Sequence, residues 1–324
     1  MVYSTSHHHS QHNVDGGGRP HPTSTAPVAQ PTQPSQPSQN CFSYSKCTGC
    51  KKALCIGINY RGRSRELKGC VNDARYIWDF LMYQWGYKSE DIVMLTDDST
   101  NPRSQPTRKN MLDGMRWLVK DAQPHDSLFF HYSGHGGQTL DKDGDEVDGY
   151  DEVISPVDFK DQGEIIDDEM HSIMVKPLPS GCHLMCSHSG TALGMCVYWC
   201  RRLLILSRLR FALYCKCMTI SKYNRDGQVK RQMISRSARK LKSSPADVIS
   251  WSACKDGQKS ADTFLGGVHV GAMSYAFISS LKKNPEQSYQ QLLRSVREIL
   301  HPKYSQKPQL GSSHHINTNL CFVL

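Results

Sequence analysis

The amino-acid sequence predicts an α/β fold in which a mainly parallel central sheet is flanked by helices. Short apolar runs of strand length alternate along the chain with segments whose apolar residues recur at helical spacing. The runs are continuous, which is typical of parallel strands covered on both faces. A helix between consecutive strands favours a parallel connection. The chain has 324 residues, 38% of them hydrophobic, which is enough for one sizeable core.

The first half of the chain supplies the alternating order of strands and helices on which this prediction depends. Continuous apolar runs indicate three strands, at 52–58, 91–95 and 128–132. Two segments between them carry apolar residues on one helical face, so we expect helices at 74–84 and 107–119.

The second half is less regular. Acidic residues in a first turn favour a helix that begins near 165. A short strand or hairpin arm is expected at 152–156, and a short apolar stretch follows at 181–185. The remaining elements predicted by their apolar patterns are a strand at 246–251, helices at 271–281 and 289–300, and a closing strand at 319–324.

The N-terminal segment has a different composition from the rest of the chain. Residues 1–46 are rich in Gln, Pro, Ser and His, and the run 30–39 is low-complexity. Such a composition cannot bury a core, so we expect a disordered arm that serves as a prodomain or interaction segment. The folded domain is predicted to span 47–324, with an anomalous segment at 194–242.

Composition also excludes several classes of protein. The net charge of +9 is unevenly spread, and the sequence lacks a nucleic-acid reading motif, so no nucleic-acid partner is expected. The sequence shows neither the apolar core of a signal peptide nor an apolar run of membrane-span length. Most of the thirteen cysteines are therefore expected to be reduced thiols, and Cys47 and Cys50 lack a second pair at zinc spacing. We expect a cytoplasmic location, with the nucleus as a second compartment.

One histidine stands out as a candidate catalytic base. His135 follows the third predicted strand and is surrounded by Gly134, Gly136 and Gly137. Glycines leave room for an imidazole at the carboxyl end of a parallel strand, where ligands bind in open α/β sheets. A structural glycine turn is the alternative. Cys186 follows a later apolar stretch, and a Cys–His pair joined across strand ends suits acyl transfer.

Several motifs follow one another along the chain in a fixed order, at 52–59, 67–74, 132–138, 148–152, 165–169, 188–193 and 244–252. Together they resemble those of type I metacaspases of the fungal kind, which belong to the caspase-like cysteine peptidases. The resemblance covers about 47–195 and 243–324, and the N-terminal arm is similar to the prodomain of that group.

The resemblance implies a caspase-like α/β sandwich and a cysteine endopeptidase that cleaves after Arg or Lys. It further implies calcium activation, frequent self-cleavage of a zymogen, a role in cell death or stress, and a monomer with peptide partners and no membrane. His135 is then the general base. In the family the nucleophile directly precedes the motif His, a position held here by Ser187, with Cys186 one residue earlier. The sequence does not decide whether Cys186 or Ser187 occupies the nucleophile position.

The resemblance also assigns substrate and metal ligands. Cys70, Asp73 and Ser133 match positions of a pocket for a basic P1 side chain, whereas Met185 stands where the family has a second pocket Asp. The residues that match calcium ligands are Asp158, Asp167 and Asp168, and Gly194 replaces a fourth Asp. The charge pattern of the acidic run 141–152 favours a solvated loop. An EF-hand is rejected because Glu146 stands where the sharp turn of that loop needs Gly.

The strand before Cys186 is four residues shorter than in the family, which should end it about 13 Å early at strand rise. The adjoining residues 194–223 match nothing in the family. They are interpreted either as a basic membrane-surface helix or as sequence that is not native coding, such as a retained intron. The predicted function therefore has an alternative, a catalytically impaired metacaspase-like protein that acts as a binding scaffold.

Overall fold

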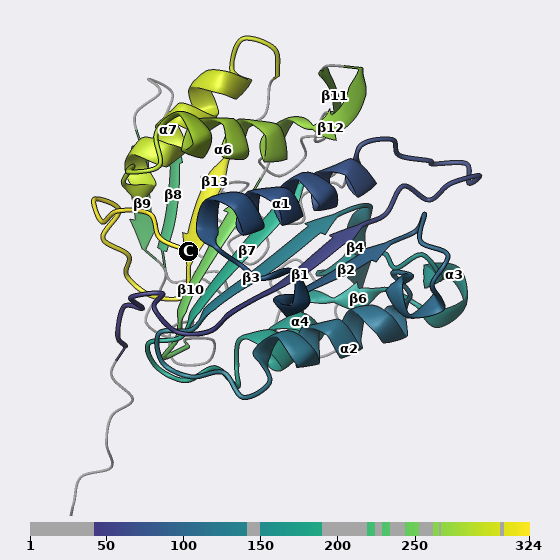
Figure 1. The fold of residues 1–324 in the computed structure, drawn as a ribbon, viewed down its shortest axis with the longest axis horizontal. Helices are drawn as coiled ribbons and strands as arrows, with labels where there is room; N and C mark the ends of the chain where they lie inside the picture. Colours follow the sequence, from purple (N-terminus) through teal and green to yellow (C-terminus); the bar gives the residue numbers. More distant parts are fainter. Residues whose placement is uncertain are drawn as a thin grey trace, which may run out of the picture. The chain divides into compact units, whose positions relative to one another are not determined.

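A computed structural model describes residues 42–140, 150–189, 219–223, 229–233, 244–252, 262–265, 267–304 and 308–324. These residues belong to one compact unit, 40–324. Its architecture is α/β with a mostly parallel central sheet between helices, which confirms the predicted fold class (Figure 1).

The central sheet has eight strands in the order β2-β1-β3-β7-β10-β13-β8-β9. The first five are mutually parallel, and the last three run antiparallel to their neighbours. Their bounds are β1 Lys51–Gly57, β2 Ile92–Thr96, β3 Ser127–Ser133, β7 His183–Ser189, β8 Thr219–Tyr223, β9 Val229–Met233, β10 Asp247–Ser252 and β13 Gln309–Ser312.

Helices cover both faces of this sheet, so its central strands are buried on both sides. The helices α1 (Cys70–Trp85), α6 (Ala272–Lys283) and α7 (Tyr289–Leu300) pack on one face (Figure 1). The other face carries α2 (Arg108–Val119) and α4 (Asp167–Met174). This double coverage is the physical reason that the strands read as continuous apolar runs.

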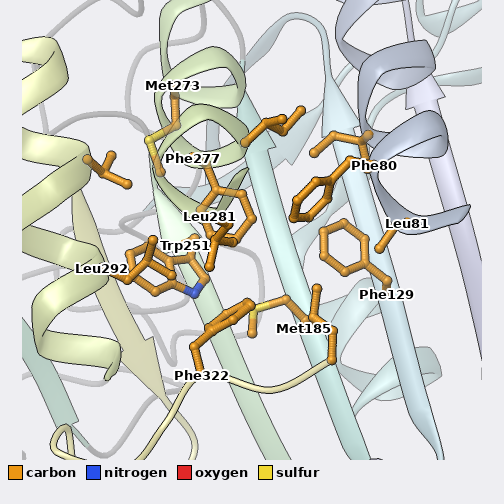
Figure 2. Packing of buried hydrophobic residues seen from close by; sticks show 14 of the residues in the cluster. Phe80, Leu81, Phe129, Met185, Trp251, Met273, Phe277, Leu281, Leu292 and Phe322 are labelled. Atoms are coloured by element: carbon orange, nitrogen blue, oxygen red, sulfur yellow. The ribbon is translucent and has the colours of Figure 1, made fainter. Parts of the chain in front are cut away.

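Alternate side chains of each strand enter different layers, as the strand period of two requires. Phe129 and Met185 project from β3 and β7 into the layer under α1, α6 and α7, where Phe80 and Phe277 meet them (Figure 2). Their neighbour Phe130 points into the opposite layer, under α2 and α4.

Smaller elements surround the site end of the sheet. A second sheet of three strands has the order β4 (Gly136–Leu140), β5 (Tyr150–Ile154) and β6 (Ile165–Ile166), so the hairpin arm near 152 is confirmed. A hairpin of β11 (Asp262–Leu265) and β12 (Val268–Gly271) leads into α6. The short helix α3 (Phe159–Gln162) precedes β6.

Two predicted elements differ from the structure. The helix α1 begins at Cys70 rather than at 74, because the Asn59 side chain accepts hydrogen bonds from the first helical N–H groups. The predicted closing strand is wrong: of 319–324 only Cys321 makes an isolated bridge, and the late strand is β13 instead. Phe322 and Leu324 are apolar because they fill the core beside α7, and strand pairing does not explain them.

The anomalous segment contributes strands that its sequence did not predict. Residues 219–223 and 229–233 form the hairpin β8–β9 at one edge of the main sheet. The rest of 194–242, including the proposed membrane-surface helix, lies outside the described residues, as does the acidic run 141–149. Within the described part of the chain, no helix is both long and apolar enough to cross a membrane.

The strand before the Cys186 motif is not short, contrary to expectation. β7 has seven residues, as many as β3, and pairs with it from Ser127 opposite His183 to Ser133 opposite Ser189. An interior strand between two full-length neighbours must be complete for their backbone groups to be paired. Residues 186–189, which should follow the strand, are therefore drawn into it.

Candidate active site

The site lies at the carboxyl edge of the parallel strands β1, β3 and β7, where their ends meet. Ser133 is the last residue of β3, and His135 follows two residues later. The residue between them, Gly134, must be a glycine because two tyrosine hydroxyls approach its Cα closely. A Cβ there would lie 2.6 Å from the Tyr132 hydroxyl oxygen and 3.1 Å from that of Tyr60. The glycine context predicted from sequence thus has a steric cause.

His135 is half-buried, and its ring orientation is fixed on one side. Its Nε2 lies 2.6 Å from the carbonyl oxygen of Arg65. A carbonyl only accepts hydrogen bonds, so we assign the proton of the neutral ring to Nε2, which leaves the Nδ1 lone pair available as a base. The imidazole stacks on the Tyr60 ring, with centroids 4.5 Å apart.

The other two histidines near the strand ends are enclosed and are not available as bases. His131 and His188 are buried on β3 and β7. Desolvation lowers the pKa of His131 to about 3 and that of His188 to about 4, because the charged ring is disfavoured away from water. Both rings are therefore neutral near pH 7.

The predicted pocket residues do come together. The Asp73 carboxylate is buried, and its Oδ2 accepts a hydrogen bond of 2.9 Å from the Ser133 hydroxyl. Cys70 lies one turn earlier on α1 and is buried as well. The Asn59 side chain starts this helix by accepting from the Cys70 and Val71 N–H groups at 3.0 and 3.2 Å. The end of β1 therefore sets where Asp73 lies.

Sequence reasoning missed two residues of this pocket, Gly271 and Ser189. The Gly271 N–H donates to Asp73 Oδ1 at 2.7 Å, and a Cβ on Gly271 would collide with both Asp73 Oδ2 and the Ser189 hydroxyl. Ser189 pairs with Ser133 across the strands, so Ser189, and not Met185, lies at the strand end near Asp73. Met185 instead packs in the core. The pairing register of β7 shows which of its residues reaches the strand end, and the sequence alone does not.

Cys186 is not brought to His135. It lies in the middle of β7 opposite Phe130, with no exposed surface, in the apolar layer with Leu184. Burial raises the pKa of its thiol above the ordinary value of 9.0, because a thiolate there would be desolvated. Ser133 lies three residues further along, about 10 Å at strand rise, and His135 lies beyond it.

Ser187, the other residue left open at the nucleophile position, points to the opposite face of β7. It pairs with His131 and is also buried. In this arrangement neither Cys186 nor Ser187 is presented to a peptide. The next residues of the motif, 190–193, lie outside the described residues.

The three aspartates expected to bind calcium do not form a site as arranged. Asp158 Oδ1 accepts the Arg108 N–H at 2.8 Å, and the Arg108 guanidinium pairs with Glu169 at 2.6 Å, so a cationic side chain already lies in this region. Asp167 and Asp168 open α4. Among the described residues, no three His, Cys, Asp or Glu side chains are grouped closely enough to hold a metal ion. Calcium binding stays a prediction from the resemblance.

Comparisons with known proteins point to one family. A profile of the metacaspase, peptidase C14 domain matches residues 51–196 and ends where the anomalous segment begins. Metacaspase-1 of Cryptococcus neoformans var. neoformans serotype D is 54% identical over 303 residues, covering 87% of this chain and 66% of that protein. Metacaspase-1A of Aspergillus terreus is 50% identical over 338 residues, covering 98% of this chain and 83% of that protein.

A likeness to a solved structure concerns the fold alone. The crystal structure of a protein from Geobacter sulfurreducens is similar with a TM-score of 0.56 and 20% identity. The match covers 85% of this chain and 98% of that one. At this identity the similarity supports the sheet-and-helix architecture and carries no statement about activity.

Proposed function

This chain belongs to the metacaspase family of cysteine-type peptidases, and from that premise we propose that it recognises peptides through an arginine or lysine at P1 and cleaves after it. The observation that carries the proposal is the buried Asp73 carboxylate at the carboxyl edge of the sheet. Ser133 and the Gly271 N–H hold it in place. A fixed, desolvated carboxylate is the partner that a guanidinium or ammonium group requires.

The expected preference within basic residues follows from charge and geometry. A planar guanidinium presents several N–H donors, so it can bond to Asp73 and to the Ser133 and Ser189 hydroxyls together. Lysine offers a point charge on a flexible stem. Because Met185 stands where the resemblance places a second carboxylate and packs in the core, the pocket carries one negative side chain among the described residues that form it. We therefore expect Arg to be preferred to Lys.

His135 supplies the acid–base chemistry in this proposal. Its free Nδ1 takes the proton from a thiol, and the thiolate attacks the scissile carbonyl carbon. The resulting imidazolium then donates that proton to the leaving amine, which gives an acyl-enzyme and a free N-terminus. A water that transfers its proton to Nδ1 hydrolyses the thioester and restores the thiol. The Arg65 carbonyl keeps the ring oriented through both steps.

A second candidate function is supported by the placement of Cys186. An enclosed mid-strand thiol with a raised pKa is a poor nucleophile. The chain would then bind basic peptides at Asp73 and turn them over weakly or not at all. It would act as a metacaspase-like binding scaffold, to which the Gln-rich N-terminal arm of 1–46 could contribute further contacts.

One experiment separates the two functions. The full chain is given fluorogenic peptides that differ only in Arg, Lys or Asp at P1, and binding of the Arg peptide is measured in parallel by anisotropy. Cleavage after Arg that is lost in Cys186→Ala and kept in Ser187→Ala supports the peptidase. Binding of the Arg peptide without cleavage supports the scaffold. If the protein binds the Asp peptide as well as the Arg peptide, basic P1 recognition is wrong.

Calcium stimulation is part of the proposal on the family resemblance alone, as are self-cleavage and a monomeric state. Asp158, Asp167 and Asp168 are not grouped closely enough in the described structure to hold a metal ion. We therefore expect calcium to bind weakly and to stimulate activity only slightly. Measuring peptide cleavage or binding across a calcium titration, with excess chelator as the zero point, tests this. An identical response with and without chelator would remove calcium from the proposal.

A further inference from the structure

Tyr60 lies three residues beyond the end of β1, in a backbone conformation that a tyrosine rarely adopts. Its φ is +54°, in the left-handed region, where a side chain with a Cβ is strained. The side chain is almost wholly buried, with 1% of its surface exposed. Strained residues that persist in a fold often hold something in place. The question is which group this tyrosine holds.

The Tyr60 side chain contacts the loop that carries His135 through both its ring and its hydroxyl. Its ring stacks on the imidazole, with centroids 4.5 Å apart and 29° between the planes. Its hydroxyl accepts a hydrogen bond from the His135 backbone N–H at 3.0 Å and donates to the Ser155 carbonyl at 2.5 Å. One residue thus fixes both the ring and the backbone of the candidate base.

Tyr132 completes the arrangement from β3. Its hydroxyl donates to the His135 carbonyl at 2.5 Å, and the Ser155 N–H donates to the same oxygen at 3.1 Å. The two phenol oxygens lie 3.2 Å apart. Burial raises the pKa of Tyr60 and of Tyr132 above 10.0, so both phenols keep their protons near neutral pH.

We propose that Tyr60 is a positioning residue of the peptidase reaction, which locks the His135 ring in the tautomer with Nε2–H on the Arg65 carbonyl and leaves Nδ1 as the base. The Tyr132 hydroxyl acts with it by holding the His135 carbonyl. This rests on the proposed function, in which His135 is the base. A packing role alone would not need a strained backbone, or a hydroxyl that bridges His135 and Ser155.

The test reads the imidazole directly, so it does not depend on turnover. ¹⁵N NMR shifts distinguish the Nδ1–H and Nε2–H tautomers, and His135→Ala assigns the signal. We expect the wild-type ring to be in the Nε2–H form. Tyr60→Phe keeps the stacking ring and loses the hydroxyl, and Tyr60→Leu loses both. We expect partial mixing of tautomers in the first variant and a larger mixed population in the second.

A matched control is Tyr87→Phe. Tyr87 is equally buried, and its hydroxyl donates to the Ser127 carbonyl at 3.3 Å, at the other end of β3. This control should leave the His135 tautomer unchanged, with thermal unfolding recorded for every variant. An unchanged tautomer in folded Tyr60→Phe and in folded Tyr60→Leu would overturn the proposal. If Tyr60→Leu fails to fold, an unchanged tautomer in both folded Tyr60→Phe and folded Tyr132→Phe overturns the proposal.

Cleavage measurements distinguish a failure of this inference from a failure of the proposed function. If the wild-type chain cleaves the Arg reporter, Tyr60→Leu should lower kcat by about 100-fold, as small misplacements of a catalytic group do, with KM little changed. A loss confined to KM would contradict positioning. If the wild type does not cleave, the proposed peptidase activity fails, and the tautomer result still decides whether Tyr60 orients His135.

Discussion

Replacing Cys186 by serine tests whether its thiol is a core side chain or a nucleophile. The side chain has no exposed surface and lies among Phe130, Leu184 and Val248. A serine hydroxyl there would be buried without its water partners, which costs about 1–3 kcal/mol. Cys186→Ala keeps the site apolar and removes one heavy atom, as Ile→Val does, so it should cost about 0.5–1.5 kcal/mol. Serine should therefore be the more destabilising change, although it is the closer isostere.

The assay is urea unfolding followed by circular dichroism, with Cys50→Ser as the control. Cys50 is exposed, so its replacement should change the free energy of unfolding by less than about 0.5 kcal/mol. The structure is refuted at this position if Cys186→Ser is as stable as the wild type and abolishes cleavage of an Arg reporter. That result would place the thiol at the surface, within reach of His135.

Three further changes test the pocket and the buried polar groups. Gly271→Ala puts a methyl group against Asp73 and should weaken binding of an Arg peptide at least ~10-fold, measured by anisotropy, with a stability cost of about 1–3 kcal/mol. Unchanged affinity would contradict the pocket. Asn59→Ala removes the acceptor for the first N–H groups of α1 and should cost about 1 kcal/mol in thermal or urea unfolding, whereas an unaffected protein would show that the helix start needs no cap. Desolvation depresses the folded-state pKa of His188 to about 4 from an ordinary 6.5, so the neutral ring favours folding. Its contribution is complete above pH 6.5 and is lost as the pH falls toward 4, on the order of 3 kcal/mol. His188→Phe should remove this part of the acid destabilisation, and equal pH slopes for variant and wild type in urea unfolding would count against it.

Much of the fold could be predicted because local patterns and tertiary burial agree. The strand that ends at Ser133 and the glycines around His135 have local causes, namely two-sided burial and the approach of two phenol hydroxyls to Gly134. Asp73 and Ser133 could be placed in one pocket because the family resemblance matched both, and the structure joins them by a hydrogen bond. The structure agrees with the predicted positions of Asp73 and Ser133, and their roles in substrate binding stay predictions.

The remainder could not be predicted, because it depends on neighbouring strands. Nothing within 183–189 reveals that Ser189 reaches the pocket edge, because the register of β7 is imposed by β3 and β10 on either side. The short apolar stretch 181–185 predicts a short strand, whereas β7 runs to Ser189 because β3 and β10 pair with it along its length. The apolar residues of 319–324 likewise predict a strand. They are apolar because Phe322 and Leu324 pack in the core with helices that are distant in sequence.

The complete β7 has a consequence for how a cell would handle this protein. All seven of its side chains are buried, including those that the motif should have carried beyond the sheet. Chaperones and proteases respond to the population of unfolded chain. Because β7 is complete and pairs with both neighbours, the central sheet gives no reason to expect more unfolded chain. We expect the chain to accumulate at ordinary abundance whether or not it can cut a peptide, so its steady-state level carries no information about its activity.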